Sequence, residues 1–119
     1  MIDSSIKICK FKIETDIYNE NLVNNLKRLE EIINMIKNNE YISIMNISNI
    51  AIEEPSPEHS SLYTYSFSIL YTTSDENIFE AFCLQLTKKL FNDKCLNDIF
   101  GVSMTNNDTM EVFVSYLMN

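Results

Sequence analysis

Glycine is almost missing from this chain, because Gly101 is the only one among 119 residues. Loops that bind phosphates or dinucleotides need several glycines at fixed spacing, since only a residue without Cβ lets the backbone approach the anion closely. The chain contains no such glycine pattern. The sequence therefore excludes the common nucleotide-binding loops.

Histidine and cysteine are also scarce. His59 is the single histidine, and Cys9, Cys83 and Cys95 are far apart in the sequence, with no CxxC pair. Zinc sites and thiol nucleophiles need these side chains at defined spacings or beside a base. We therefore expect no metal, no cofactor and no enzymatic activity. The odd cysteine number predicts reduced, structural thiols rather than a disulfide framework.

Long apolar runs are missing too. The longest contains only a few residues, whereas a helix that spans a membrane needs roughly 20. The first residues, MIDSSIKICK, lack the apolar segment of a secretory signal. We expect a soluble cytoplasmic protein that does not bind membranes and that folds as one domain over residues 1–119.

Positive charge is in the minority. Nine Lys and Arg residues stand against 17 Asp and Glu residues, which gives a formal net charge of −8. This excess repels nucleic acid and anionic lipid and attracts basic surfaces. We therefore expect no nucleic-acid partner and a protein partner with a basic surface.

The segments that are present include four with the apolar and β-branched pattern of strands. They are residues 6–13, 41–52, 62–72 and 102–116. Asn46 and Asn49 interrupt the second segment, which predicts an irregular strand. A turn signal at residues 106–108 divides the fourth segment, which predicts either one strand with an extension or a hairpin.

Two segments have helical spacing. Residues 21–39 repeat Leu and Ile at positions three and four apart, with Asn19 or Asn21 as the cap. A second helix follows Glu76, and Thr73 stands at capping-box spacing before it. Cys83 falls on the apolar side of this helix, where a free cysteine packs as a small hydrophobe.

The order of these elements is β-α-β-β-α-β, with a further C-terminal strand if the last segment is a hairpin. It predicts an α+β two-layer sandwich and resembles the split-βαβ arrangement of ferredoxin-like domains. The resemblance is to a fold that serves many functions, so it implies no activity.

An acidic loop at residues 53–61 is the first candidate contact site. Glu53, Glu54, Glu58 and His59 surround two prolines there, and such a projection can bind lysines or arginines of a partner. The alternative is a solvated connector whose prolines only limit its flexibility. A lone loop histidine beside a glutamate is more simply an exposed side chain than a metal ligand or a base.

The sheet supplies the second candidate. If both helices cover one face, the other is polar or meets a partner, and Leu62, Leu70, Phe113 and Leu117 fall on it. These residues predict an apolar patch for a homodimer or a target protein. By contrast, the aromatic row in residues 63–71 lacks interleaved Lys or Arg, which indicates core packing rather than an RNA-binding platform.

These features together favour a non-enzymatic, acidic protein-binding module. The expected role is an inhibitor or adaptor of the immunity or counter-defence type, which occludes a basic site on its partner. Two alternatives stay open: a homo-oligomeric structural or scaffold protein, and a domain that binds a small molecule between sheet and helices.

Overall fold

Strands form a mixed sheet in the computed structural model, which describes residues 5–37, 40–58, 61–93 and 100–117. The sheet has six strands, and β3 lies beyond β2 along the same edge, because both pair with β4. The strands are β1 (Lys7–Thr15), β2 (Ile42–Ile47), β3 (Ala51–Glu53), β4 (Tyr63–Thr73), β5 (Phe100–Asn106) and β6 (Thr109–Tyr116). The irregularity expected in residues 41–52 is a register shift between Ile44 and Asn46, followed by the break between β2 and β3.

The strand order is β2-β4-β1-β6-β5. β1 pairs antiparallel with β4, as the split-βαβ pattern requires, but parallel with β6. In a ferredoxin-like sheet, the strand in the position of β6 would come directly after the second helix and would run antiparallel to β1. Here β5 takes the outer position and turns back, so that β6 enters between β5 and β1. The ferredoxin-like order is therefore not the order of this sheet, although the α+β class is confirmed.

The first helical segment is two helices rather than the single one that its spacing predicts. These are α1 (Glu20–Leu26) and α2 (Leu29–Ile36), and Arg28 leaves helical geometry between them with φ −108° and ψ 21°. Asn19 caps α1, since its side chain accepts a hydrogen bond from the backbone N–H of Leu22. The break lets both halves of the apolar stripe bury against the same core.

The remaining helix is α3 (Glu76–Leu90). Asp75 caps its start, because the Asp75 carboxylate accepts a hydrogen bond from the N–H of Asn77. Thr73 does not cap it as the capping-box spacing predicts. The Thr73 hydroxyl accepts from the N–H of Asp75 instead, and Glu76 pairs with Lys7 on β1.

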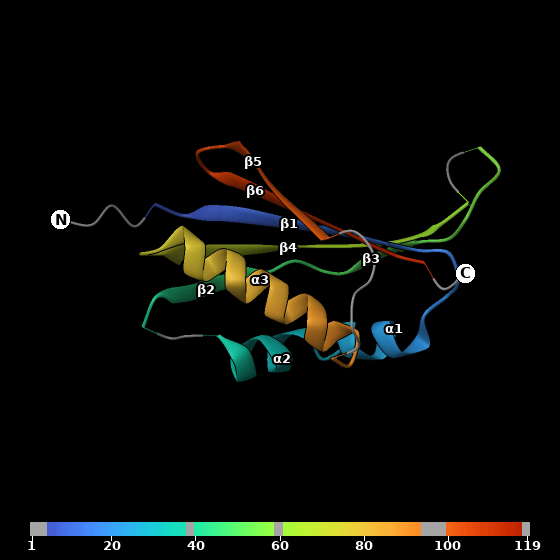
Figure 1. Cartoon of the computed structure of the whole chain (residues 1–119), viewed down its shortest axis with the longest axis horizontal. Coiled ribbons are helices and arrows are strands. Elements are labelled where there is room, and N and C mark those ends of the chain that lie inside the picture. The colour runs from blue at the N-terminus through green and yellow to red at the C-terminus, as the bar shows by residue number, and fades with distance from the viewer. Residues whose placement is uncertain (1–4, 38–39, 59–60, 94–99, 118–119) are drawn as a thin grey trace.

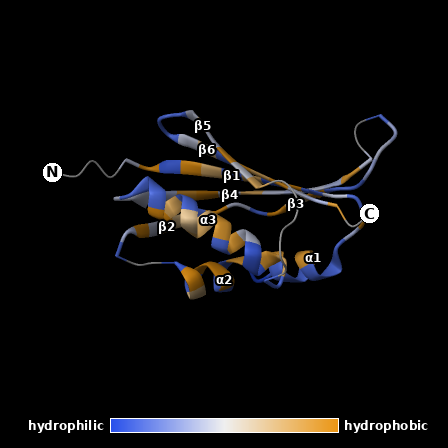
Figure 2. Ribbon diagram, in the orientation of Figure 1, coloured by the Kyte–Doolittle hydropathy of each residue, from blue (hydrophilic) through white to orange (hydrophobic). Residues whose placement is uncertain are grey.

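The three helices of the described residues lie on one side of the sheet, and β5 lies at the edge away from them (Figure 1). The core fills the space between the layers, and apolar residues follow the strands and the helices that face them (Figure 2). Tyr65, Phe67 and Tyr71 of the aromatic row are buried there, as expected for core packing. Cys83 is also buried, with its sulfur 3.9 Å from that of Cys9.

The described residues form one compact domain. Their radius of gyration is 14.4 Å, close to the value of about 13.5 Å expected for a compact chain of this length. None of the helices in the described ranges has the length and apolar character needed to cross a membrane.

Candidate functional site

The described part of the acidic loop expected at residues 53–61 leaves the sheet at the end of β3 and projects from one end of the molecule (Figure 1). Glu53 is the last residue of β3 and pairs with Thr64. Glu53, Glu54 and Glu58 are all exposed, and we call these three residues the acidic arm. His59 lies outside the described residues.

Among the residues that the structure describes, none of the basic side chains forms an ion pair with a carboxylate of the acidic arm. The ion pairs within the described ranges are Lys7–Glu76, Arg28–Glu31 and Lys89–Asp93, and none includes the arm. The negative charge of the arm is therefore available to a partner.

A shallow groove of 610 Å³ runs across the face of the sheet that the helices leave open. Glu53 and Phe113 both line it, and Lys10 and Lys12 of β1 lie between them. Lys12 pairs with Phe113 on β6 and with Ser66 on β4, so the middle of the groove is polar. The groove thus has the carboxylate of Glu53 at one end and the ring of Phe113 at the other, with lysine and hydroxyl side chains between them.

The four apolar residues expected on this face do not form one patch. Leu62 precedes β4 and Leu70 lies near its far end, so about 26 Å of extended strand separates them. Phe113 is half-buried in the groove, whereas Leu117 follows β6 and is 44% exposed. Lysine and serine side chains lie between these apolar residues, so the open face of the sheet is mainly polar. Of the four, only Phe113 lines the groove.

A second hollow of 240 Å³ lies where the parallel strands β1 and β6 both end. We call it the crevice. Thr15 and Tyr116 are paired at the ends of these strands, and the chain turns from Thr15 into α1. In α/β sheets, ligands bind outside the carboxyl ends of parallel strands, where the chain connections on either side leave a gap.

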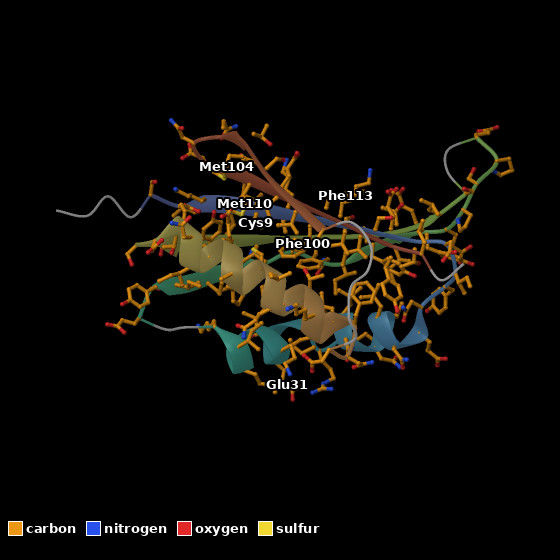
Figure 3. The ribbon with its side chains drawn as sticks, in the orientation of Figure 1. Cys9, Glu31, Phe100, Met104, Met110 and Phe113 are labelled. Atoms are coloured by element: carbon orange, nitrogen blue, oxygen red, sulfur yellow. The ribbon has the colours of Figure 1, made fainter. Side chains whose placement is uncertain are left out.

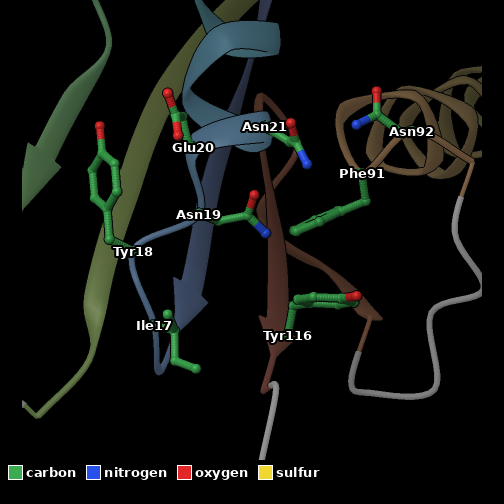
Figure 4. A pocket seen from close by; sticks show the side chains of 8 residues that line it. All are labelled: Ile17, Tyr18, Asn19, Glu20, Asn21, Phe91, Asn92 and Tyr116. Atoms are coloured by element: carbon green, nitrogen blue, oxygen red, sulfur yellow. The ribbon is translucent and has the colours of Figure 1, made fainter.

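Aromatic and amide side chains line the crevice. Phe91, at the end of α3, stacks on Tyr116 with 4.6 Å between ring centroids, and Asn19, Glu20 and Asn92 lie around them (Figure 4). None of the eight lining residues is basic. The crevice therefore suits a small neutral or cationic molecule with a flat apolar face better than a phosphate.

Buried hydrogen bonds hold the backbone of the crevice. The Tyr65 hydroxyl lies 3.2 Å from the Thr15 hydroxyl and accepts from the N–H of Asn19. Asn92 has φ 57°, and its N–H bonds to the carbonyl of Lys89 as in a Schellman helix end. The crevice was not among the sequence-based candidates, because its position depends on β6 lying parallel to β1.

Two groups with raised pKa values lie in the core, away from both hollows. The contact with Cys9, together with burial, raises the pKa of the Cys83 thiol well above its usual value near 9. Burial, and then the charge of Glu76, raises the pKa of the Tyr71 hydroxyl. Both groups stay protonated at neutral pH and act as packed core side chains.

The described residues contain no cluster of three or more His, Cys, Asp or Glu side chains that could hold a metal ion. Cys95 lies outside these residues. Comparisons with protein-family models, with curated proteins and with solved structures find no match to this chain.

Proposed function

We propose that this protein is a non-enzymatic, cytoplasmic protein-binding module that occludes a basic site on a partner, as an inhibitor of the immunity or counter-defence type does. The observation that carries the proposal is the groove that Glu53 and Phe113 share on the open face of the sheet. Charge and apolar surface occur there together, which is the combination that protein interfaces use.

The acidic arm supports the first step of binding. Its three exposed carboxylates have no ion pair with the described basic residues, and the whole chain carries a formal charge of −8. A field of this sign attracts a basic protein over a distance of about one Debye length, roughly 8 to 10 Å at moderate salt. The arm therefore increases the association rate.

The groove supports the second step. Phe113 is half-buried, so a partner side chain that covers it removes apolar surface from water with little rearrangement of the sheet. Lys10 and Lys12 lie in the same groove, and we expect the partner to present hydroxyl or carboxylate groups to them. Aromatic residues at the centre of an interface contribute most to its affinity.

The test starts with affinity purification of the tagged protein from its source cells, or from the host if the gene is viral, and mass spectrometry of the bound proteins. We expect one stoichiometric partner with a basic surface. Replacement of Glu53, Glu54 and Glu58 by lysine should lower its association rate by about tenfold or more and remove the salt dependence. Phe113→Asp should raise the dissociation rate while the circular dichroism spectrum stays unchanged.

A matched control carries three lysines in place of Glu30, Glu80 and Asp108. These carboxylates are also exposed but do not line the groove, and the change in net charge is the same. The control should bind the partner with a smaller loss of association rate than the arm variant. Equal losses of association rate in the arm variant and the control would show that only the net charge matters. For the groove, a Phe113→Asp variant that fails to fold would place Phe113 in the core and contradict its role in binding.

The crevice favours one other function, the binding of a small molecule. Stacked aromatic rings and amides at the ends of two parallel strands form a preorganised hollow. Thermal unfolding in the presence of a library of small neutral and cationic metabolites tests this function. A ligand that raises the melting temperature of the wild type but not of Asn92→Ala would support it, and no stabilisation by any compound would count against it.

A further inference from the structure

The outer edge of β5 is open in the part of the chain that the structure describes. β6 pairs with one side of this strand, and within the described ranges no strand pairs with the other side. An edge strand presents a row of N–H and C=O groups that another strand can pair with. A β-strand is therefore the kind of partner that this edge fits.

β5 has little that protects an edge strand from pairing, because its one register shift lies after Met104, at the hairpin end. Its residues Phe100 to Met104 pair in regular register with β6, and they include no charge and no proline. The opposite edge of the sheet differs. β2 is interrupted by the shift between Ile44 and Asn46, and β3 is three residues long and ends in Glu53. Bulges, short length and charge are the usual means of blocking an edge.

The apolar layer of the core also continues onto β5 without full cover. Phe100, Val102 and Met104 pair with Val114, Val112 and Met110, which are each 1% exposed. Phe100 and Val102 are only half-buried, and Met104 is 47% exposed at the hairpin (Figure 3). A strand paired with the outer edge of β5 would place its own side chains next to these partly exposed residues and remove part of their apolar surface from water.

The sequence of β5 fits a second copy of itself. Residues 100–107 are uncharged in a chain with a formal charge of −8, so two copies can approach along this edge with the least repulsion. Antiparallel pairing centred on Ser103 would place Val102 opposite Met104 on the helix side and the two serines together on the open side. Such an isologous contact closes as a dimer and leaves no further edge of this type.

We propose that two copies of this chain form a dimer by antiparallel pairing of their β5 strands about a two-fold axis at Ser103. The dimer joins the two sheets edge to edge. It goes beyond the proposed function, because the acidic arm lies at the other edge of each sheet and stays free. A dimer of this kind presents two arms to a partner.

Sedimentation equilibrium over a wide range of protein concentrations tests the dimer. We expect a reversible monomer–dimer equilibrium in the wild type. Met104→Lys should raise the dimer dissociation constant by about tenfold or more, because it places a lysine on the pairing edge. Met45→Lys is the matched control: Met45 is 55% exposed on β2, at the opposite edge, and its substitution should leave the equilibrium unchanged.

A cross-link tests the position of the axis. Ser103→Cys in a Cys95→Ser background, treated with oxidised glutathione, should give a disulfide-linked dimer on a non-reducing gel, and Ser43→Cys on β2 in the same background should not. A wild type that stays monomeric at all concentrations overturns the proposal. A dimer that is insensitive to Met104→Lys and gives no link through position 103 also overturns it, since it would use another surface.

Discussion

At the scale of single residues, the clearest feature is the buried hydroxyl of Tyr71. Its ring stacks on that of Phe79 with 3.6 Å between centroids, and its hydroxyl donates to Glu76 at 3.4 Å. Burial and the nearby carboxylate disfavour the phenolate, so the pKa of Tyr71 in the folded protein is raised above the ordinary value of 10. The protein therefore depends on the neutral form of this side chain.

We predict a loss of stability at alkaline pH that Tyr71→Phe reduces. Above pH 10 the unfolded chain releases the tyrosine proton while the folded protein keeps it, so the unfolded state binds fewer protons and the free energy of unfolding falls as the pH rises. One such group contributes a slope of about 1.4 kcal/mol per pH unit. Urea unfolding of wild type and variant between pH 8 and pH 11 measures this slope.

Tyr41→Phe is the control for this prediction, because Tyr41 is exposed and loss of its hydroxyl should leave the slope unchanged. If Tyr71→Phe and Tyr41→Phe lose stability with pH as steeply as the wild type, Tyr71 is ionised as easily in the folded protein as in water. With the raised pKa of Tyr71, the stability contributed by its neutral hydroxyl is fully present below pH 10 and is lost as the pH rises above that value.

At the scale of elements, the end of α3 depends on a side chain from α1. Asn25 is 8% exposed, and its amide donates to the carbonyl of Leu90 at 2.9 Å and to the Asn92 side chain at 3.0 Å. The last carbonyls of a helix have no partner within the helix. Asn25 thus supplies a donor where α3 ends and fixes the two helices together beside the crevice.

We predict that Asn25→Ala lowers the free energy of unfolding by about 1 to 3 kcal/mol, because it leaves buried acceptors without their donor. The measurement is urea unfolding at neutral pH. Asn24→Ala is the matched control, since Asn24 is the exposed neighbour in the same helix and should change stability by less than about 0.5 kcal/mol. Equal effects of the two substitutions would mean that the bonds to Leu90 and Asn92 contribute nothing.

At the scale of the whole molecule, one hydrophobic cluster joins the sheet to all three helices. It includes Met110 of β6, Leu22 of α1, Ile33 of α2 and Phe79 of α3. No second cluster lies elsewhere in the described part of the chain that would let one region unfold alone. Small domains with a single core usually unfold in one cooperative step.

We therefore predict that urea transitions followed by far-UV circular dichroism and by tyrosine fluorescence coincide, with the same midpoint and the same slope. An earlier transition in either signal would contradict this prediction and would indicate that the β5–β6 hairpin separates from the rest of the sheet before the core unfolds.

The sequence by itself determined the order of the helical and strand segments and most of their buried faces. Alternation at residues 62–72 and helical spacing after Glu76 are local patterns. The side chains that they predict as buried are buried, except Tyr63, which is half-buried. The acidic loop could also be identified, because two prolines and three carboxylates stand together. Local chemistry suffices for such features, since they depend on neighbours a few residues apart.

The tertiary structure alone decided how the elements meet. Whether β6 lies parallel to β1, and whether residues 21–39 bend at Arg28, depends on packing between segments far apart in sequence. For this reason the crevice, the groove that joins Glu53 to Phe113, and the open edge of β5 could not be predicted from the sequence. Each is formed by strands that come together only when the long-range pairing of the sheet is complete.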